Sequence, residues 1–554
     1  MNKPLVTLGL LALCQAGLAQ QPPTGGALQV PPPPAAQRAE PGIRIQQREA
    51  PAGAPAAADA VRIVVDTLRI QGATLFPEAE LLAHSGFRAG SELSLADLQA
   101  MAARITAHYR SRGYFVAQAY LPAQDIRDRV VTIAVSEGRL GNVQLRNSSK
   151  LSDGVARRAL AGLEPGDVIA TAPVESALLL LSDMPGVQVQ STLVPGASVG
   201  TSDLLVDVAP GRRVTGSIDA DNAGNRYTGE WRVGATINFN EPLGLGDVAS
   251  LRVLTSGDGL KYARLSYQLQ VGHGQVGVAY SHLEYELGKE FESLRAHGTA
   301  QIASVYGRYP IVRSRSTNVY AQLAFDAKEF DDRVDAIPTA TDRNVRVLMG
   351  SLFGDHRDRW GGGGVSTWFL TWSTGRLDIG TPAARALDAL GARTNGHYNK
   401  LSFAATRLQS LGGPFSLHAG VSGQLASKNL DVSEKMSLGG MNGVRAYPEG
   451  EAYADQGALV VLEGRMDLPP LPQAVPGRMQ LVAFVDAGRV QMYRNPWAGG
   501  DNERTLSGAG VGINWGDPGN FLVRAYYARK LGSEGATSAP DKSGRFWLQL
   551  VKYL

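Results

Sequence analysis

Two short segments in the C-terminal half of the chain carry opposite charges that could pair. Arg445 is the third residue of a Gly-Val-Arg-Ala-Tyr segment at 443–447, and Asp486 is the third residue of a Phe-Val-Asp-Ala-Gly segment at 484–488. A guanidinium and a carboxylate can form a bidentate, charge-assisted pair, which is suited to holding a long loop in place. Such a pair makes and breaks no covalent bond. The two motifs therefore favour a pore over an enzyme.

No other group of residues suggests catalysis from its spacing. A Gly-His-Gly-Gln-Val-Gly segment at 272–277 has the G-x-G-x-x-G spacing of a dinucleotide site, but it follows one alternating strand and leads into another. A hairpin turn is the better interpretation. We expect no enzyme activity, no cofactor and no metal. The histidines show no metal-ligand spacing and no Ser/His/Asp arrangement, among them His84, His108, His273, His282, His356 and His418.

The elements that must position Arg445 and Asp486 are β-strands. From residue 211 to 554 apolar and polar residues alternate with a period of two, in roughly sixteen segments of about ten residues each. In the first clear example one face carries Trp231, Val233, Ala235, Ile237 and Phe239. An even number of such strands predicts a closed outer-membrane barrel with a polar lumen. A soluble β-sandwich is the alternative, since it also alternates inside and outside.

The connections between these segments fall into two groups. Tight turns are predicted at 271–275, 410–414 and 516–520, and long polar connections at 327–344, 375–398, 428–455 and 493–505. Outer-membrane barrels show this asymmetry, with short turns on the periplasmic side and long loops outside.

The N-terminal residues decide the compartment. Lys3, the apolar run from Leu5 to Leu13 and a small-residue site near Ala19 predict a signal peptide at 1–19. The only cysteine, Cys14, lies within it. Residues 20–60 are rich in proline, alanine and glycine and predict a flexible or extended linker. The 54 basic and 51 acidic residues are dispersed, so we expect no nucleic-acid partner.

Two small α+β modules are predicted between the linker and the barrel, at 61–138 and 139–210. Each has the order strand, helix, helix, strand, strand, weaker in the second copy. The strongest helix of the first module opens with Ser94 and Asp97 at capping-box spacing and stops at Gly113.

Four phrases in these modules resemble the paired POTRA domains of the two-partner secretion transporter (TpsB) family. They are Tyr-Arg-Ser-Arg-Gly-Tyr at 109–114, Leu-Pro-Ala-Gln-Asp-Ile at 121–126, Val-Ser-Glu-Gly at 135–138 and Met-Pro-Gly-Val at 184–187. The stretch Val444, Arg445, Ala446 and Tyr447 resembles the Val-Arg-Gly-Tyr loop signature of the same family. Phe484, Asp486 and Gly488 match its Phe-x-Asp-x-Gly strand motif.

The resemblance implies an outer-membrane barrel of about 16 strands, preceded by two POTRA domains in the periplasm. Its sixth outward loop, around 438–455, would fold back into the lumen so that Arg445 contacts Asp486. The family's function is type Vb (two-partner) secretion: the POTRA domains bind a large exoprotein of adhesin, haemolysin or contact-dependent toxin type, which passes through the barrel. Outer-membrane lipids and, during biogenesis, the barrel assembly machinery are further implied partners.

Two alternatives stay open at this point. An assembly factor of the same superfamily would insert other proteins into the outer membrane, although such factors usually carry more POTRA modules. A porin-like channel would leave the modules and the arginine loop without a role. The chain also departs from the family pattern twice. First, Ala446 replaces the usual glycine, and an alanine would be strained if the backbone had a positive φ there. Second, the 20–60 segment is broken by prolines and offers no amphipathic plug helix.

Overall fold

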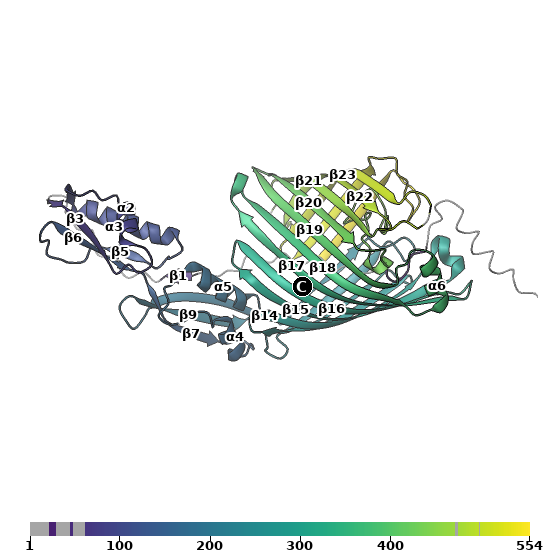
Figure 1. Ribbon diagram of the computed structural model, residues 1–554, viewed down its shortest axis with the longest axis horizontal. Coiled ribbons are helices and arrows are strands. Elements are labelled where there is room, and N and C mark those ends of the chain that lie inside the picture. Colours follow the sequence, from purple (N-terminus) through teal and green to yellow (C-terminus); the bar gives the residue numbers. More distant parts are fainter. Residues whose placement is uncertain (1–21, 29–44, 48–60, 471, 473–474, 498) are drawn as a thin grey trace, which may run out of the picture.

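The computed structural model describes residues 22–28, 45–47, 61–470, 472, 475–497 and 499–554. Two α+β modules lie in line at one end of a closed antiparallel barrel (Figure 1). The predicted fold class, a barrel of about 16 strands behind two POTRA-like modules, is confirmed. The predicted signal peptide lies outside the described residues. None of the described helices combines the length and the apolar character needed to cross a membrane.

Each barrel strand pairs with its neighbours in sequence, and β10 pairs with β25 to close the ring. The closing pair is short, running from Ser217 opposite Tyr553 to Asp221 opposite Gln549. The strands are β10 (Val214–Asp221), β11 (Arg232–Asn240), β12 (Val248–Thr255), β13 (Leu260–Val271), β14 (Gly274–Glu286), β15 (Ala296–Arg313), β16 (Thr317–Val334), β17 (Thr339–Asp358), β18 (Gly364–Ile379), β19 (Gly396–Gly412), β20 (Phe415–Ala426), β21 (Gln456–Asp467), β22 (Arg478–Gln491), β23 (Glu503–Asp517), β24 (Phe521–Lys530) and β25 (Gly544–Tyr553).

The alternation in the sequence corresponds to the two faces of this wall. Apolar side chains on the outer face are exposed, as at Val233 (56%), Leu265 (61%) and Leu323 (59%). Such a face suits lipid. The G-x-G-x-x-G segment is the β13–β14 hairpin turn, as predicted, with Gly272 at a φ of +61°.

One predicted connection is wrong. The segment 327–344 was expected to be a long loop, but β16 and β17 stay paired from Ala327 opposite Arg346 to Val334 opposite Thr339. Only 335–338 connect them. The outward face of this hairpin is polar, and its inward face mixes charged residues with Phe330 and Val345. Its composition is therefore close to that of a loop, although its backbone is a paired hairpin. Among the other connections, β18 and β19 are joined through α6 (Pro382–Leu390), and short 3₁₀ turns lie at Lys289–Leu294, Trp360–Gly362 and Val432–Glu434.

The first module packs two helices on strands. Its elements are β2 (Arg62–Val65), β3 (Thr67–Gln71), α2 (Glu78–Ser85), β4 (Ser91–Ser94), α3 (Leu95–Ser111), β5 (Gln118–Tyr120) and β6 (Val130–Ser136). The predicted capping box opens α3: the Ser94 hydroxyl accepts a hydrogen bond from the Asp97 amide at 3.1 Å, and the Asp97 carboxylate accepts one from the Ser94 amide at 2.9 Å.

The second module contains β7 (Arg139–Asn147), α4 (Asp153–Ala159), α5 (Thr171–Ser182), β8 (Val187–Pro195) and β9 (Thr201–Pro210). Its sheet gains a fourth strand, β1 (Ile45–Gln47), which runs parallel to β8 opposite residues 191–193. β1 comes from the stretch predicted to be a linker. The module also docks on the barrel: Arg313 donates to Asp183 at 2.6 and 2.8 Å, and the Ser152 amide donates to the Gly244 carbonyl at 2.8 Å.

A second part of the predicted linker lies inside the barrel. Residues 22–28 form turns, with the Gly25 amide donating to Asp332 Oδ1 at 3.0 Å and the Tyr453 hydroxyl donating to the Ala27 carbonyl at 2.9 Å. Leu28 is 6% exposed and packs with apolar lumen residues. This segment occupies the lumen as turns and not as a helix.

Glu137, from the Val-Ser-Glu-Gly phrase, is the polar centre of the first module. Its buried carboxylate accepts hydrogen bonds from the Thr74 amide at 2.6 Å, the Leu75 amide at 2.9 Å and the Tyr109 hydroxyl at 3.0 Å. Burial alone would raise the pKa of Glu137, but these bonds outweigh it and hold the pKa below its ordinary value.

We predict that Glu137→Gln destabilises the first module by about 1–3 kcal/mol at neutral pH, because an amide matches fewer of these donors. Since the folded-state pKa is lowered, the stabilisation is complete above the free carboxyl value of about 4.3 and is lost as the pH falls through the folded value. Hydrogen exchange of residues 61–138 in the full-length protein should show the difference at pH 7 and a smaller one near pH 3. The exposed Glu92→Gln is the control, and equal exchange in both variants would contradict the assignment.

Candidate functional site in the barrel lumen

The connection between β20 and β21, residues 427–455, is the sixth at the barrel end away from the modules, and we call it loop 6. It turns into the barrel instead of projecting outward. The Met436 amide donates to the Ala454 carbonyl at 3.0 Å, and the Val444 amide donates to the Leu438 carbonyl at 2.8 Å. Val444, Ala446 and Tyr447 are each 0% exposed. The loop therefore has its own hydrogen-bonded structure and a buried tip.

Arg445 at this tip joins two carboxylates of the barrel wall. Its Nε and Nη2 donate to the two oxygens of Asp486 at 2.8 and 2.7 Å, and its backbone amide donates to the same group at 3.1 Å. Nη1 donates to Glu463 Oε1 at 2.8 Å. The side chains of Arg445, Asp486 and Glu463 are 5%, 0% and 7% exposed. The structure thus brings the two motifs of the sequence into direct contact.

The other two residues of the strand motif contact the same tip from β22. The Arg445 guanidinium lies over the Phe484 ring, 3.4 Å from its centroid, which adds a cation–π contact to the ion pair. At Gly488 a Cβ atom would collide with the Leu438 side chain of loop 6. Residues two apart share one face of a strand. The Phe484 ring, the Asp486 carboxylate and the space left by Gly488 therefore lie in a row beneath the loop.

Tyr447 and Trp547 connect the tip to the last two strands. The Tyr447 hydroxyl donates to the Glu534 carbonyl at 3.0 Å, and Lys530 Nζ lies 4.6 Å from the Tyr447 ring centroid. Trp547 Nε1, on β25, donates to the Arg445 carbonyl at 2.7 Å. The tip is therefore held by β21, β22 and β25 together.

Ala446, where the related motif has glycine, fits without backbone strain. It is absent from the non-glycine residues of positive φ in the described chain. Its methyl group lies against Gly508 of β23, where an added Cβ would stand 2.5 Å from the Ala446 Cβ. A glycine on the facing strand supplies the space that an alanine at the tip requires.

The base of loop 6 is also held to the barrel wall by ion pairs, but the signs are reversed relative to the tip. Here the loop supplies the acids: Asp431 accepts from Arg343 at 2.6 Å, and Glu434 contacts Lys328 and Lys400 at 2.8 Å each. Further along the loop, the Glu451 carboxylate accepts a hydrogen bond from the Ser538 amide at 2.8 Å, which binds loop 6 to the β24–β25 connection. The same carboxylate pairs with Arg504 of β23.

Sequence reasoning missed several of these residues. Glu463 stands opposite Phe484 in the β21–β22 register, and its signal was a charged residue on the inward face of a strand that begins apolar. Trp547, Glu451 and Arg504 carried no such signal, because Trp547 meets Arg445 across 102 positions and Arg504 meets Glu451 across 53.

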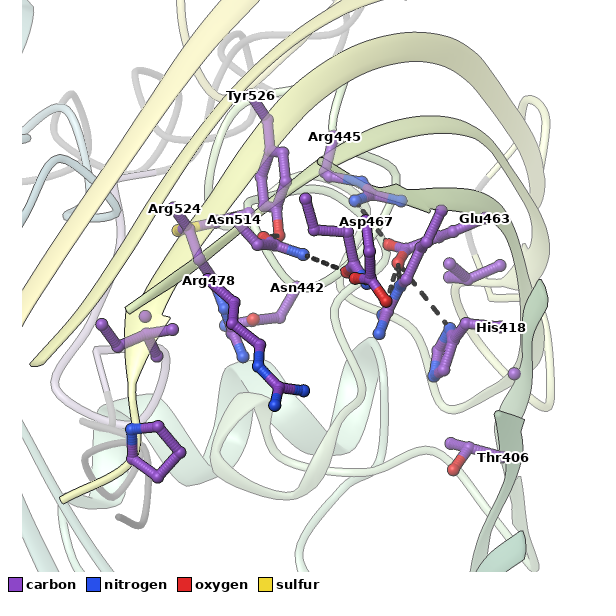
Figure 2. Close-up of a pocket in the computed structure, with 18 of the residues that line it drawn as sticks. Thr406, His418, Asn442, Arg445, Glu463, Asp467, Arg478, Asn514, Arg524 and Tyr526 are labelled. Atoms are coloured by element: carbon purple, nitrogen blue, oxygen red, sulfur yellow. Dashed lines mark hydrogen bonds and ion pairs between the residues drawn. The ribbon is translucent and has the colours of Figure 1, made fainter. Parts of the chain in front are cut away.

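Below the tip lies a cavity of about 1020 Å³ that reaches the turns on the module side of the barrel. Figure 2 shows Arg445 at the top of the cavity, Glu463 and His418 on one side, and Arg478 and Arg524 on the other. The lining is polar and mixed in charge. The module-side half of the lumen is thus open, whereas loop 6 and residues 22–28 fill space towards the other end.

Comparison with known proteins defines the class. Residues 200–515 match the family described as haemolysin secretion/activation protein ShlB/FhaC/HecB, and residues 63–138 match the POTRA domain, ShlB-type. The chain belongs to the ShlB/FhaC/HecB family, the two-partner secretion transporters, so the resemblance inferred from the motifs is confirmed. The protein is an outer-membrane barrel whose POTRA modules lie in the periplasm.

Individual relatives agree with this assignment. The heme/hemopexin transporter protein HuxB of Haemophilus influenzae is 29% identical over 472 residues, 84% of this chain and 82% of that protein. The outer membrane transporter CdiB of Dickeya dadantii is 23% identical, covering 73% and 72% of the two chains. The structure of CdiB from Escherichia coli superposes with a TM-score of 0.70 at 21% identity, covering 91% of this chain and 92% of that one. These family members are transporters and not enzymes.

We predict that Arg445→Ala frees loop 6, because it leaves the fully buried Asp486 carboxylate without a cation, whereas Glu463 keeps its pair with Arg465. Breaking a buried pair from one side costs about 3–5 kcal/mol, so hydrogen exchange across 438–447 should accelerate by about two orders of magnitude or more. Arg489→Ala is the matched control, since Arg489 lies on the same strand as Asp486 and pairs with Glu503 of β23, but the two side chains are 70% and 54% exposed. Unchanged protection in Arg445→Ala would contradict the prediction.

A second prediction concerns the alanine at the tip. Gly508→Ala should displace loop 6, because its new methyl group meets that of Ala446. Adding Ala446→Gly should restore most of the protection of the loop, and Ala446→Gly alone should have a small effect. Exchange rates of the four proteins of this double-mutant cycle measure the coupling. Additive effects would show that the two residues are not in contact.

Proposed function

We propose that this protein exports a large exoprotein across the outer membrane. The observation that carries the proposal is a lumen open on the periplasmic side and closed further out by a loop that one buried arginine holds. The POTRA modules bind the cargo in the periplasm. The cargo then passes through the barrel as an extended chain and folds outside, and folding there gives the movement its direction.

Strand addition is a suitable mode of capture for an unfolded cargo, since main-chain hydrogen bonds tolerate many sequences. The strand order in the sheet of the second module is β1, β8, β9, β7, so β7 forms one edge and β1 covers β8 at the other. Within the part of the chain that the structure describes, β1 pairs with three of the nine residues of β8. A cargo segment could extend this partial pairing or displace β1, and this would bring it next to the barrel rim where Asp183 contacts Arg313.

Loop 6 and residues 22–28 must move for an extended chain to pass. The Arg445 pair is the main electrostatic tie of the loop tip, whereas the 22–28 segment is held by the hydrogen bonds of Gly25 and Ala27 and the burial of Leu28. We infer that the resting state keeps the pore closed and that the cargo opens it. HuxB is called a heme/hemopexin transporter and CdiB an outer membrane transporter. For this chain the cargo class is an adhesin, a haemolysin or a contact-dependent toxin.

The alternatives fit the same features less well. An assembly factor shares the barrel and the loop motif, but two modules with a docked second module provide a shorter periplasmic arm. A porin-like channel needs an unobstructed lumen, and here loop 6 fills part of it.

The test is secretion of the exoprotein encoded beside this gene, in cells with the wild type, Arg445→Ala or Arg489→Ala at matched barrel levels. We expect the wild type and the exposed control to release it into the medium, and Arg445→Ala to release at least tenfold less. Cargo retained in the periplasm with the wild type, together with a loss of other outer-membrane proteins on deletion of the gene, would overturn export in favour of assembly.

A further inference from the structure

Three possible metal ligands gather on the two helices of the first POTRA module, far from loop 6. Glu80 and His84 lie one turn apart on α2, so that their side chains share a face. His108 lies on α3. Each residue offers one donor atom, an imidazole nitrogen from each histidine and a carboxylate oxygen from Glu80. These three atoms lie within 4.8 Å of one another.

His108 is the unusual member of the group. It is 7% exposed, and its Nε2 is buried without a hydrogen bond, although Glu80 Oε1 stands 3.1 Å away. The distance is that of a contact, but the geometry is not that of a hydrogen bond. The Phe76 ring packs against His108 edge-on at 4.9 Å. Buried polar atoms normally have a hydrogen-bond partner or another ligand. The His108 ring nitrogen has no hydrogen bond, although a carboxylate lies beside it, so a ligand shared by the two groups would satisfy it.

His84 completes the arrangement from the solvent side. Its ring stacks on that of His108, with centroids 4.0 Å apart and planes inclined by 28°. His84 is exposed and Glu80 is partly exposed, so both side chains are free to adjust and the site is open to ions in solution. Ligation at about 2.0–2.2 Å requires donors nearer than roughly 4.4 Å to one another. The nitrogen lone pairs of the stacked rings lie in nearly parallel planes, so the exposed His84 must leave the stack and turn its ring to share an ion with His108.

We propose that Glu80, His84 and His108 bind a zinc ion. Two imidazoles and one carboxylate suit zinc and the neighbouring transition metals, whereas calcium and magnesium prefer oxygen ligands throughout. Three protein ligands leave the fourth position of a tetrahedral zinc to water. The ion would join α2 to α3 and supply the buried His108 nitrogen with its partner. The proposal departs from the expectation of no metal, which rested on spacing along the sequence.

The proposal goes beyond protein export and does not depend on it. Zinc bound here stabilises the folded first module by mass action, and it fixes the angle between the two helices. The module would then be more rigid in a zinc-replete periplasm.

The test is zinc binding by untagged full-length protein in detergent, stripped with a chelator and titrated with Zn²⁺ against a chromogenic competitor. We expect one equivalent in the wild type and at least tenfold weaker binding in both Glu80→Gln and His84→Ala. These two residues are not fully buried, so their variants should fold, whereas a His108 variant would leave a cavity. His297→Ala is the control, because His297 also stands near an acid, Asp335, but on the barrel and 45% exposed.

Visible absorption of bound Co²⁺ gives a second readout, since a tetrahedral site has bands that scattered surface binding lacks. The wild type and His297→Ala should show them, and Glu80→Gln and His84→Ala should not. Wild-type protein that binds no zinc would overturn the proposal. Equal zinc binding by all four proteins would overturn it as well.

Discussion

The position of loop 6 depends on one buried cation between two buried acids. Arg445 satisfies Asp486 and Glu463 at once, and all three side chains are almost completely withdrawn from solvent. In such surroundings an unpaired charge is far more costly than a paired one. The pair is therefore less a source of net stability than a condition for one geometry. If the loop tip does not reach this point, Asp486 is left buried without a cation, while Glu463 keeps only Arg465.

The charges along loop 6 make that geometry unique. At its base the loop is acidic and the wall basic, through Asp431 and Glu434. At its tip the loop is basic and the wall acidic. A loop shifted along the lumen would place like charges together, which is unfavourable at low dielectric. Shape adds to this selection, because Gly488 accommodates Leu438 and Gly508 accommodates Ala446. Electrostatics and packing thus specify the same closed arrangement.

The barrel and the modules supply the frame for this arrangement. Continuous pairing from β10 to β25 fixes which residues face inward, and the contact between Asp183 and Arg313 fixes the second module on the rim. The N-terminal segment contacts both parts, with residues 22–28 in the lumen and β1 on the module sheet. A partner that engages the module sheet would therefore compete with the same chain that occupies the pore.

Several features of the fold could be predicted from the sequence because they depend on local pattern. Alternation with a period of two predicted the barrel, and the capping box at Ser94 predicted α3. The spacing in the two motifs of Arg445 and Asp486 was also local. The 335–338 turn was mistaken for part of a long loop, since a hairpin with one polar and one mixed face resembles a loop until its pairing is known.

The tertiary structure alone decided how distant residues meet. Arg445 finds Glu463 and Trp547 across 18 and 102 positions, and no spacing rule predicts such pairs. Ala446 seemed a source of backbone strain because its φ cannot be known from the sequence, and Gly508, which makes room for its methyl group, lies on another strand. His108 joins Glu80 and His84 because α2 and α3 pack together. The sequence determined which faces are apolar and where strands and helices begin, since these depend on neighbours along the chain. The closed ring and the packed helices decided which charges and ligands come together, since burial is a property of the assembled fold.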